Sequence, residues 1–201
     1  MNCHIVGYPL KKPRSVILWN HFFKSKKINM KMTEKEISKE KLKDFIQYVK
    51  KDSSFYAMAV TMPYKKIFYK LSRITDDITK YSKSVNLIIK KNNKLLGFNT
   101  DILSLIKILS KFKKKNILII GMGGTGEAIL NVFKEKYKKT NISVVTSKKK
   151  NKQKKITFFN SISETAVSEK DLIINCTPLG SSLDKKYTNK TPIRNSLFKH
   201  I

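Results

Sequence analysis

Acidic side chains are scarce in this sequence of 201 residues: 14 Asp and Glu stand against 43 Lys and Arg, and the net charge is +29. A charge of that size is typical of proteins that bind nucleic acid or an anionic surface. Arginine is also scarce, with only Arg14, Arg73 and Arg194, whereas phosphate and base recognition relies on the planar guanidinium group. The basic runs at 113–115 and 148–155 lack the interleaved aromatics on which single-stranded bases stack. We therefore expect a solvated basic surface and no nucleic-acid partner.

Cysteine and histidine are few, at two and three residues. Cys3 and Cys176 lie far apart, form no CxxC pair and have no histidine at metal-ligand spacing, so the sequence predicts free thiols and no metal site. No apolar run approaches the roughly 20 residues that a membrane-spanning helix needs, and the N-terminus has no apolar signal segment. These absences favour a cytoplasmic protein without a membrane partner.

Short apolar runs typical of strands alternate along the chain with segments at helical spacing. In the first half we expect strands at 3–8, 31–37 and 55–62, helices at 15–27, 40–51, 63–81 and 102–110, and a hairpin over 84–101 that turns at Asn92-Asn93. After the lysines at 113–115 the pattern restarts, with strands at 116–121, 142–147, 156–159 and 171–178 and a helix at 124–137. The alternation predicts an α/β fold with a mostly parallel sheet, divided near residues 101–112.

The stretch Gly121-Met122-Gly123-Gly124-Thr125-Gly126 places the pattern G-x-G-x-x-G directly between a buried strand and a helix. There a glycine makes the tight turn, a missing side chain admits a pyrophosphate, and the helix N-terminus offers free N–H groups. A purely structural turn is the alternative. The next strand ends in Thr146-Ser147-Lys148, without the carboxylate that would bind the ribose hydroxyls of NAD. Hydroxyl and ammonium groups suit the 2′-phosphate of NADP, so NADP is the predicted cofactor and NAD the alternative.

Three segments of the first half carry polar groups beside predicted strands, at 60–65, 84–86 and 97–101. Together they supply hydroxyl, carboxamide, amine and carboxylate groups. Such a set is suited to holding a small polyhydroxylated molecule and moving a proton.

In order and spacing, these motifs resemble the shikimate dehydrogenase family across nearly the whole chain. The family's N-V-T-x-P-x-K, A-V-N-T, G-x-N-T-D, G-A-G-G-A and N-x-T-P-x-G correspond here to residues 59–65, 84–87, 97–101, 121–125 and 175–180, with serine at position 84. The resemblance implies an N-terminal three-layer α/β substrate domain at 1–101 and a Rossmann-type NADP domain at 102–201. It also implies reversible, NADP-dependent reduction of 3-dehydroshikimate to shikimate, on the route to chorismate and the aromatic amino acids.

The resemblance also assigns roles to individual residues. Lys65 would transfer the proton, with Asp101 beside it. The substrate would be bound by Ser15, Thr61, Asn86 and Asp101. The cofactor would be bound by Asp77, Gly121, Gly123, Gly124, Thr125, Gly126, Thr146, Ser147, Lys148 and Thr177. A solvated helix charge is the alternative for Asp77.

Two features depart from the family pattern. Pro13 stands where the family has the first of two serines that hold the substrate carboxylate, so Lys12 or Arg14 would have to supply a charged contact instead. The family also continues for roughly another quarter of its length, so we expect an incomplete cofactor domain whose last strand, at 171–175, is an exposed apolar edge. An active dehydrogenase and a non-catalytic remnant that keeps the fold both remain open, as does the oligomeric state, homodimer included.

Overall fold

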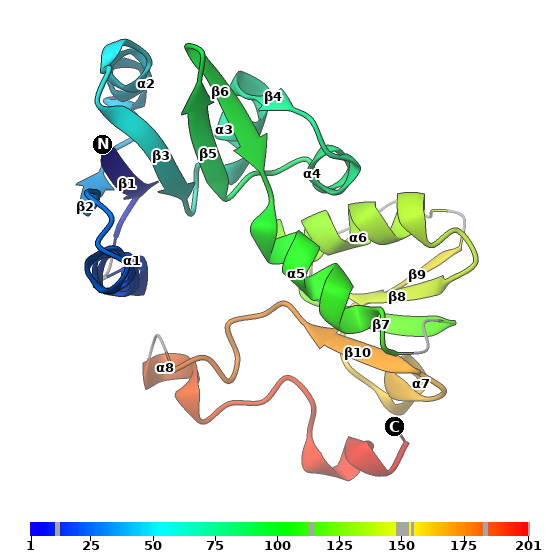
Figure 1. Cartoon of the computed structure of the whole chain (residues 1–201). Helices are drawn as coiled ribbons and strands as arrows, with labels where there is room; N and C mark the ends of the chain where they lie inside the picture. The colour runs from blue at the N-terminus through cyan, green and yellow to red at the C-terminus, as the bar shows by residue number, and fades with distance from the viewer. Residues whose placement is uncertain (11–12, 113–114, 148–152, 154, 183–184, 201) are drawn as a thin grey trace. The chain divides into compact units, whose positions relative to one another are not determined.

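The computed structural model describes residues 1–10, 13–112, 115–147, 153, 155–182 and 185–200, and the chain folds as two compact units, Met1–Ser104 (unit 1) and Leu105–Ile201 (unit 2) (Figure 1). The sequence placed the boundary between residues 101 and 102; the structure divides the chain three residues later, within a helix that both units share.

Unit 1 is built on a six-stranded sheet of order β2-β1-β3-β5-β6-β4. Its elements are β1 Asn2–Gly7, α1 Arg14–Ser25, β2 Lys31–Glu36, α2 Leu42–Lys51, β3 Phe55–Val60, α3 Lys65–Leu71, β4 Arg73–Ile74, α4 Asp77–Ser82, β5 Leu87–Lys91, β6 Lys94–Phe98 and the start of α5 Thr100–Leu109. β1, β2 and β3 are parallel, as expected, whereas β5 runs antiparallel to both β3 and β6. The hairpin turn at Asn92 and Asn93 is confirmed, since both residues have left-handed φ angles of 49° and 57°, as a tight two-residue turn requires.

Helices cover both faces of the first sheet. On one face, α2 and α3 contribute Phe45 and Phe68 to a core with Met58, Val60 and Ile88 of the strands. On the other face, α1 packs Phe23 against Cys3, Ile5 and Met32. The predicted three-layer α/β arrangement is confirmed.

The second face of the sheet is only partly covered. Beside α1 lies an apolar hollow of about 260 Å³, and Trp19, Phe23, Met30, Tyr56 and Leu87 are among its lining residues. Trp19 is 46% exposed and its ring lies 5.6 Å from that of Phe22. Unit 1 therefore carries a small exposed aromatic surface on α1.

The prediction of one helix over 63–81 is wrong. The chain leaves helix α3 after Leu71, because Arg73 and Ile74 pair with Leu96 and Gly97 of β6 and form the short strand β4. A new helix, α4, then begins behind Asp76, whose Oδ1 accepts a hydrogen bond of 2.8 Å from the Thr79 backbone N–H. Aspartate is a common N-cap residue, so the sequence itself contains a signal that a helix starts after Asp76.

Unit 2 contains a four-stranded parallel sheet of order β10-β7-β8-β9. Its elements are β7 Asn116–Ile120, α6 Gly124–Lys136, β8 Asn141–Val145, β9 Ile156–Phe159, α7 Glu164–Val167, β10 Leu172–Asn175, α8 Lys185–Thr188 and the 3-10 helix η1 Asn195–His200. The four predicted strands and the helix after the glycine loop are present, whereas α7, α8 and η1 were not predicted.

Strand β10 lies at an edge of this sheet, as expected. Its apolar side chains are less exposed than predicted, since Ile174 is buried and Ile173 packs against a cluster that includes Val167, Ile193 and Leu197. The segment that follows β10 thus covers one face of the edge strand.

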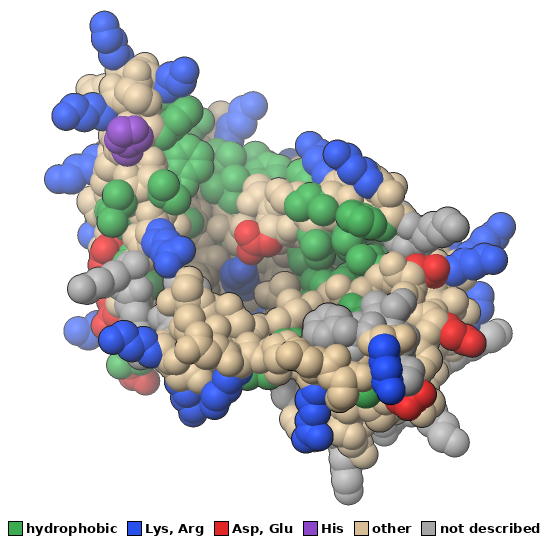
Figure 2. All heavy atoms as spheres, turned by 90° about the horizontal axis from the view of Figure 1, so that it is seen from below, with side chains coloured by type: hydrophobic (Ala, Val, Ile, Leu, Met, Phe, Trp, Pro, Cys, Tyr) green, Lys and Arg blue, Asp and Glu red, His purple; other side chains and the backbone are tan. Residues whose placement is uncertain are grey.

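Basic side chains are spread widely over the surface. In the face shown in Figure 2, Lys and Arg side chains are spread over much of the surface, and few acidic side chains lie among them. In the part of the chain that the structure describes, no helix combines the length and apolarity needed to cross a membrane.

Candidate active site

The antiparallel direction of β5 brings three polar residues to one edge of the first sheet. Lys65 opens helix α3 behind β3, Asp101 lies in the first turn of α5 behind β6, and Asn86 directly precedes β5. Because β5 runs opposite to its neighbours, its start lies beside their ends. The backbone of Asn86 is held on both sides, since the Val60 N–H donates to its carbonyl at 2.8 Å and its own N–H donates to the Phe98 carbonyl at 3.0 Å.

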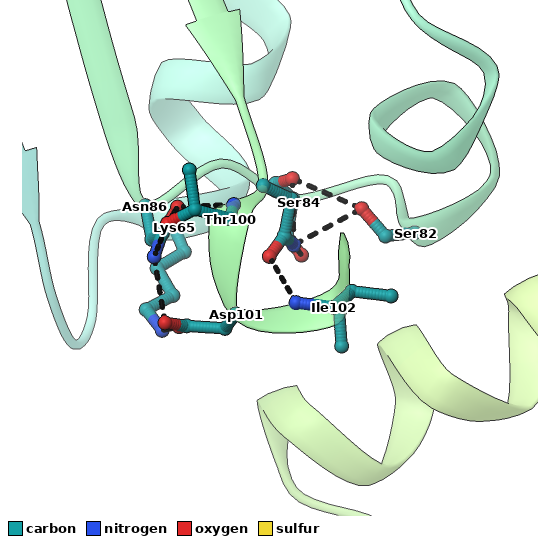
Figure 3. A network of polar contacts seen from close by, with 8 residues as sticks. Lys65, Ser82, Ser84, Asn86, Thr100, Asp101 and Ile102 are labelled. Atoms are coloured by element: carbon teal, nitrogen blue, oxygen red, sulfur yellow. Dashed lines mark hydrogen bonds and ion pairs between the residues drawn. The ribbon is translucent and has the colours of Figure 1, made fainter. Parts of the chain in front are cut away.

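The side chains of these residues form one connected polar group (Figure 3). Lys65 Nζ donates to Asp101 Oδ2 at 2.7 Å, and Asn86 Nδ2 donates to Asp101 Oδ1 at 2.7 Å. The backbone N–H of Thr100 donates to Asn86 Oδ1 at 2.8 Å. Since a backbone N–H can only donate, this bond fixes which end of the Asn86 amide faces Asp101.

This group remains accessible to a ligand. The Lys65 and Asp101 side chains are 30% and 53% exposed, and an ammonium group has three protons, of which the bond to Asp101 uses one. The carboxylate orients the amine, and both can still contact hydroxyl or carbonyl oxygens of a small molecule. The arrangement can therefore bind an oxygen and exchange a proton with it.

Directly behind this group lies Asn99, which the sequence reasoning did not single out. Asn99 is 4% exposed, and its side chain accepts from the Ile102 N–H at 3.1 Å at the start of α5. Its Nδ2 lies 3.1 Å from Ser82 Oγ and 2.9 Å from Ser84 Oγ. An asparagine directly before a helical pattern is the signal that could have identified it.

The other residues assigned in unit 1 are not part of this hydrogen-bonded group. Ser15 lies in the first turn of α1, Thr61 follows β3, and Asp77 is the exposed first residue of α4. Among the residues that the structure describes, no hydrogen bond joins any of these three side chains to Lys65, Asn86 or Asp101. Arg14 is exposed at the start of α1, and Lys12 lies outside the described residues.

In unit 2, the conformation of the glycine loop depends on residues that have no side chain. Gly121 has a φ of +94°, a conformation that L side chains rarely adopt. A Cβ on Gly126 would lie 2.0 Å from the Gly121 carbonyl oxygen, so only glycine allows helix α6 to pack this closely on the loop. A Cβ on Gly123, in contrast, would meet nothing within 4 Å, so the space above this residue is open.

A pocket of about 310 Å³ lies over this loop. Its lining consists of Ile120, Gly121, Met122, Gly123, Val145, Thr146, Ser147 and Thr177. Gly124 and Gly126 lie in the first turn of α6 with Thr125, where backbone N–H groups and the positive end of the helix dipole favour an anion. Lys148 lies outside the described residues.

Thr177 reaches the pocket from a turn that its own neighbours fix. Its N–H and its hydroxyl both donate to Asn175 Oδ1, at 2.9 Å and 2.7 Å, and Asn175 Nδ2 donates to the Leu179 carbonyl at 3.0 Å. Cys176 lies between Asn175 and Thr177 in the chain. Burial raises the pKa of its thiol to about 11, so this thiol stays protonated and unreactive. The hydrogen bonds within N-x-T-P-x-G thus hold Thr177 in place at the wall of the pocket.

The donors of this pocket fit a dinucleotide with a phosphorylated ribose. The loop offers open space and backbone N–H groups for a pyrophosphate, and the end of β8 offers the hydroxyls of Thr146 and Ser147 with no carboxylate among Val145, Thr146 and Ser147. Within the described residues, no three His, Cys, Asp or Glu side chains are grouped so as to hold a metal ion.

Comparison with known proteins agrees with this geometry. Residues 5–88 match the family described as shikimate dehydrogenase substrate binding domain. A protein from Methanococcus vannielii named shikimate dehydrogenase (NADP(+)) is 30% identical over 96% of this chain and 73% of its own length. A protein of the same name from Pyrococcus furiosus is 32% identical over 96% of this chain and 72% of its own length.

The fold is similar to solved structures as well. A shikimate dehydrogenase from Peptoclostridium difficile superimposes with a TM-score of 0.76 at 25% identity, over 99% of this chain and 74% of that one. The chain therefore spans about three quarters of the length of these three relatives.

Proposed function

This chain belongs to the shikimate dehydrogenase family, and on that premise we propose that it catalyses the NADP-dependent, reversible reduction of 3-dehydroshikimate to shikimate. The reaction is an oxidoreductase step on the route to chorismate and the aromatic amino acids. The observation that carries the proposal is the group formed by Lys65, Asn86 and Asp101 at the edge of the first sheet. As part of the same proposal we place the protein in the cytoplasm, where its two free thiols would persist.

Each residue of this group has a chemical role in the proposal. Reduction of a ring carbonyl requires a proton at the oxygen, and the Lys65 ammonium group supplies it and recovers it in the reverse direction. Asp101 holds the amine in place through its 2.7 Å contact and accepts a hydrogen bond from a substrate hydroxyl. Asn86 holds the second carboxylate oxygen and presents its amide to the substrate, with Thr61 and Ser15 as further substrate contacts.

NADP, when bound, supplies or takes up the hydride at the ring carbon. The pocket over Gly121 and Gly123 would hold its pyrophosphate, while Gly124, Thr125 and Gly126 contribute the helix N-terminus. Thr146 and Ser147 would contact the 2′-phosphate, and Thr177 would contact the cofactor from the turn after β10. Asp77, the exposed first residue of α4, stays a prediction from the family resemblance alone, with a solvated helix charge as the alternative.

The test is an assay of the purified full chain with shikimate and NADP⁺, followed by the absorbance of the reduced cofactor. Lys65→Ala is expected to lower kcat by roughly 10²- to 10⁴-fold. Lys70→Ala, an exposed lysine on the same helix, is the matched control and should keep full activity. Folded protein that binds NADP but forms no reduced cofactor would overturn the proposal and identify the chain as a non-catalytic member of the family.

A further inference from the structure

Four polar residues behind the candidate site form a buried cluster that we call the Asn99 cluster: Thr79, Ser82, Ser84 and Asn99. All four are no more than 5% exposed. They come from helix α4, from the segment before β5 and from the residue before α5. None of them contacts the surface where a substrate would bind, and none has a role in the proposed reaction.

Asn99 is the centre of this cluster because it bonds to every other member. Its backbone N–H donates to Thr79 Oγ1 at 2.8 Å. Its Nδ2 reaches Ser82 Oγ at 3.1 Å, the Ser84 carbonyl at 3.1 Å and Ser84 Oγ at 2.9 Å. Its Oδ1 accepts from the Ile102 N–H at 3.1 Å. The polar atoms of its side chain therefore all have partners, at a buried position where a lost partner is costly.

The hydrogen bonds of Asn99 link the Asn99 cluster to the candidate site, because the bonded residues lie close in the chain to residues of that site. Ser84 lies two residues before Asn86, and Asn99 lies two residues before Asp101. The bond between Ser84 and Asn99 thus ties the segment that carries Asn86 to the segment that carries Asp101 (Figure 3). The helix cap on Ile102 further fixes the first turn of α5, in which Asp101 lies.

We propose that Asn99 is a positioning residue for the reaction, and that the hydroxyls of Ser82 and Ser84 hold it in that role. Its side chain sets the separation between Asn86 and Asp101, and through Asp101 it sets the place of the Lys65 amine. The Ser84 hydroxyl is a feature of this chain, since the related motif A-V-N-T has alanine at this position. This proposal rests on the proposed function, because the group that is positioned is the proposed catalytic group.

The first test removes the cluster's acceptors one at a time, with Ser84→Ala, Ser82→Ala and the double variant. Each change deletes one hydroxyl and leaves the Ser84 carbonyl in place. We expect kcat to fall by roughly 10-fold in the double variant, with a shifted pH profile of kcat, because displacing a proton donor by a fraction of an ångström is enough to slow proton transfer. The affinity for NADP, measured by calorimetry, should not change in Ser84→Ala, since the pocket over the glycine loop lies in unit 2 and Ser84 is not part of α4, the helix of Asp77.

Asn99→Ala is the stronger variant, with an expected loss of roughly 100-fold in kcat. The serine variants keep the test decisive if this protein does not fold. Ser143→Ala, which removes the hydroxyl of a buried serine in unit 2, controls for lost stability alone. Serine variants that melt at a lower temperature but keep the parent's kcat and pH profile would reduce the cluster to a structural role and overturn the proposal.

A readout without turnover separates this proposal from the proposed function. In ¹⁵N spectra, the side-chain amide of Asn86 and the backbone amide of Asp101 should move in the serine variants and in Asn99→Ala. If the parent chain proves inactive, the proposed function fails while these signals still decide the positioning role. Unchanged Asn86 and Asp101 signals would contradict it.

Discussion

In unit 1 the candidate site consists of side chains, whereas in unit 2 it consists largely of places where side chains are absent. Lys65, Asn86 and Asp101 come from three segments and reach their geometry through hydrogen bonds of 2.7 Å to each other. Gly121 and Gly123 come from one loop and Gly126 from the first turn of α6 that follows it, and they leave room for a ligand and for the close packing of this helix. The site in unit 1 should fail when one of its hydrogen-bonding side chains is lost. The site in unit 2 should fail when a Cβ is added to one of its glycines. The following three substitutions test this difference, and a change of pH then tests unit 1 alone.

The largest loss of stability and of NADP binding is expected from Gly126→Ala, which adds a single methyl group. Its new Cβ would lie 2.0 Å from the Gly121 carbonyl oxygen, which is backbone and cannot move aside. We expect unit 2 to lose about 3 kcal/mol or more of stability, together with NADP binding. Calorimetric unfolding and titration with NADP measure both. Full NADP affinity in this variant would show that the loop is not as tightly packed as the structure indicates.

The second change, Asp101→Asn, removes a charge in unit 1 without changing size. Lys65 loses its ion-pair partner, so kcat should fall by roughly 100-fold while NADP affinity stays within about twofold of the parent. Steady-state rates and NADP titration provide the measurement. Asp44→Asn makes the same substitution at an exposed position on α2 and should be silent. Equal rates in both variants would remove Asp101 from the proposed mechanism.

The third change, Gly123→Ala, separates the two roles of glycine within one loop. No atom lies within 4 Å of the added Cβ, so stability should change by less than about 1 kcal/mol. The methyl group would nevertheless occupy the space proposed for the pyrophosphate, and NADP affinity should fall by roughly 10-fold or more. A folded variant that binds NADP as the parent does would place the cofactor elsewhere.

The smallest effect is expected from the pH dependence of unit 1. Burial is the main cause that lowers the pKa of His4 below its ordinary value of 6.5; the charge of Lys35 lowers it further, while Asp52 opposes the shift. The imidazole stacks on Phe55 at 5.6 Å and its Nδ1 bonds Thr33 Oγ1 at 2.8 Å. Below pH 6.5 the unfolded chain therefore binds a proton that the folded unit resists, so stability is full above this pH and declines as pH falls toward the lower folded value.

Urea unfolding followed by circular dichroism at pH 7.5 and 5.5 measures this decline. His4→Phe keeps the aromatic stacking and cannot titrate, so its midpoint should change less between the two pH values. His21→Gln, at an exposed position on α1, should keep the parent's dependence. A decline of the same size in His4→Phe would assign the effect to other groups.

The comparison also explains how far the sequence could predict the molecule. The glycine loop of unit 2 was predictable because all its parts are adjacent in the chain and each glycine has a local steric reason. The Lys65 group was predictable in membership, through motifs, but its geometry depends on β5 running antiparallel between β3 and β6. The turn at Asn92-Asn93 predicts that β5 runs antiparallel to β6, but no local pattern records that β5 also pairs with β3, which places the start of β5 beside the ends of both strands.

The features that the sequence did not predict depend on contacts between residues that are far apart in the chain. The sequence pattern identifies Asn99 as a helix cap, yet the other hydrogen bonds of its side chain go to Ser82 and Ser84, which lie at least 15 residues away. The helix predicted over 63–81 is interrupted because Arg73 and Ile74 gain a strand partner in β6, at Leu96 and Gly97. Apolar spacing in that stretch is compatible with one helix, and only the distant pairing excludes it.

Trp19 is the one tryptophan of the chain, and it stands half-exposed in unit 1 beside the apolar hollow of the first sheet. Its intrinsic fluorescence is therefore a natural optical label for one unit alone. Emission that shifts to longer wavelength on denaturation would follow unit 1, while circular dichroism follows the helices and strands of both. Two unfolding curves that coincide would mean that the units melt together, and two that separate would give the stability of each without any added dye or tag.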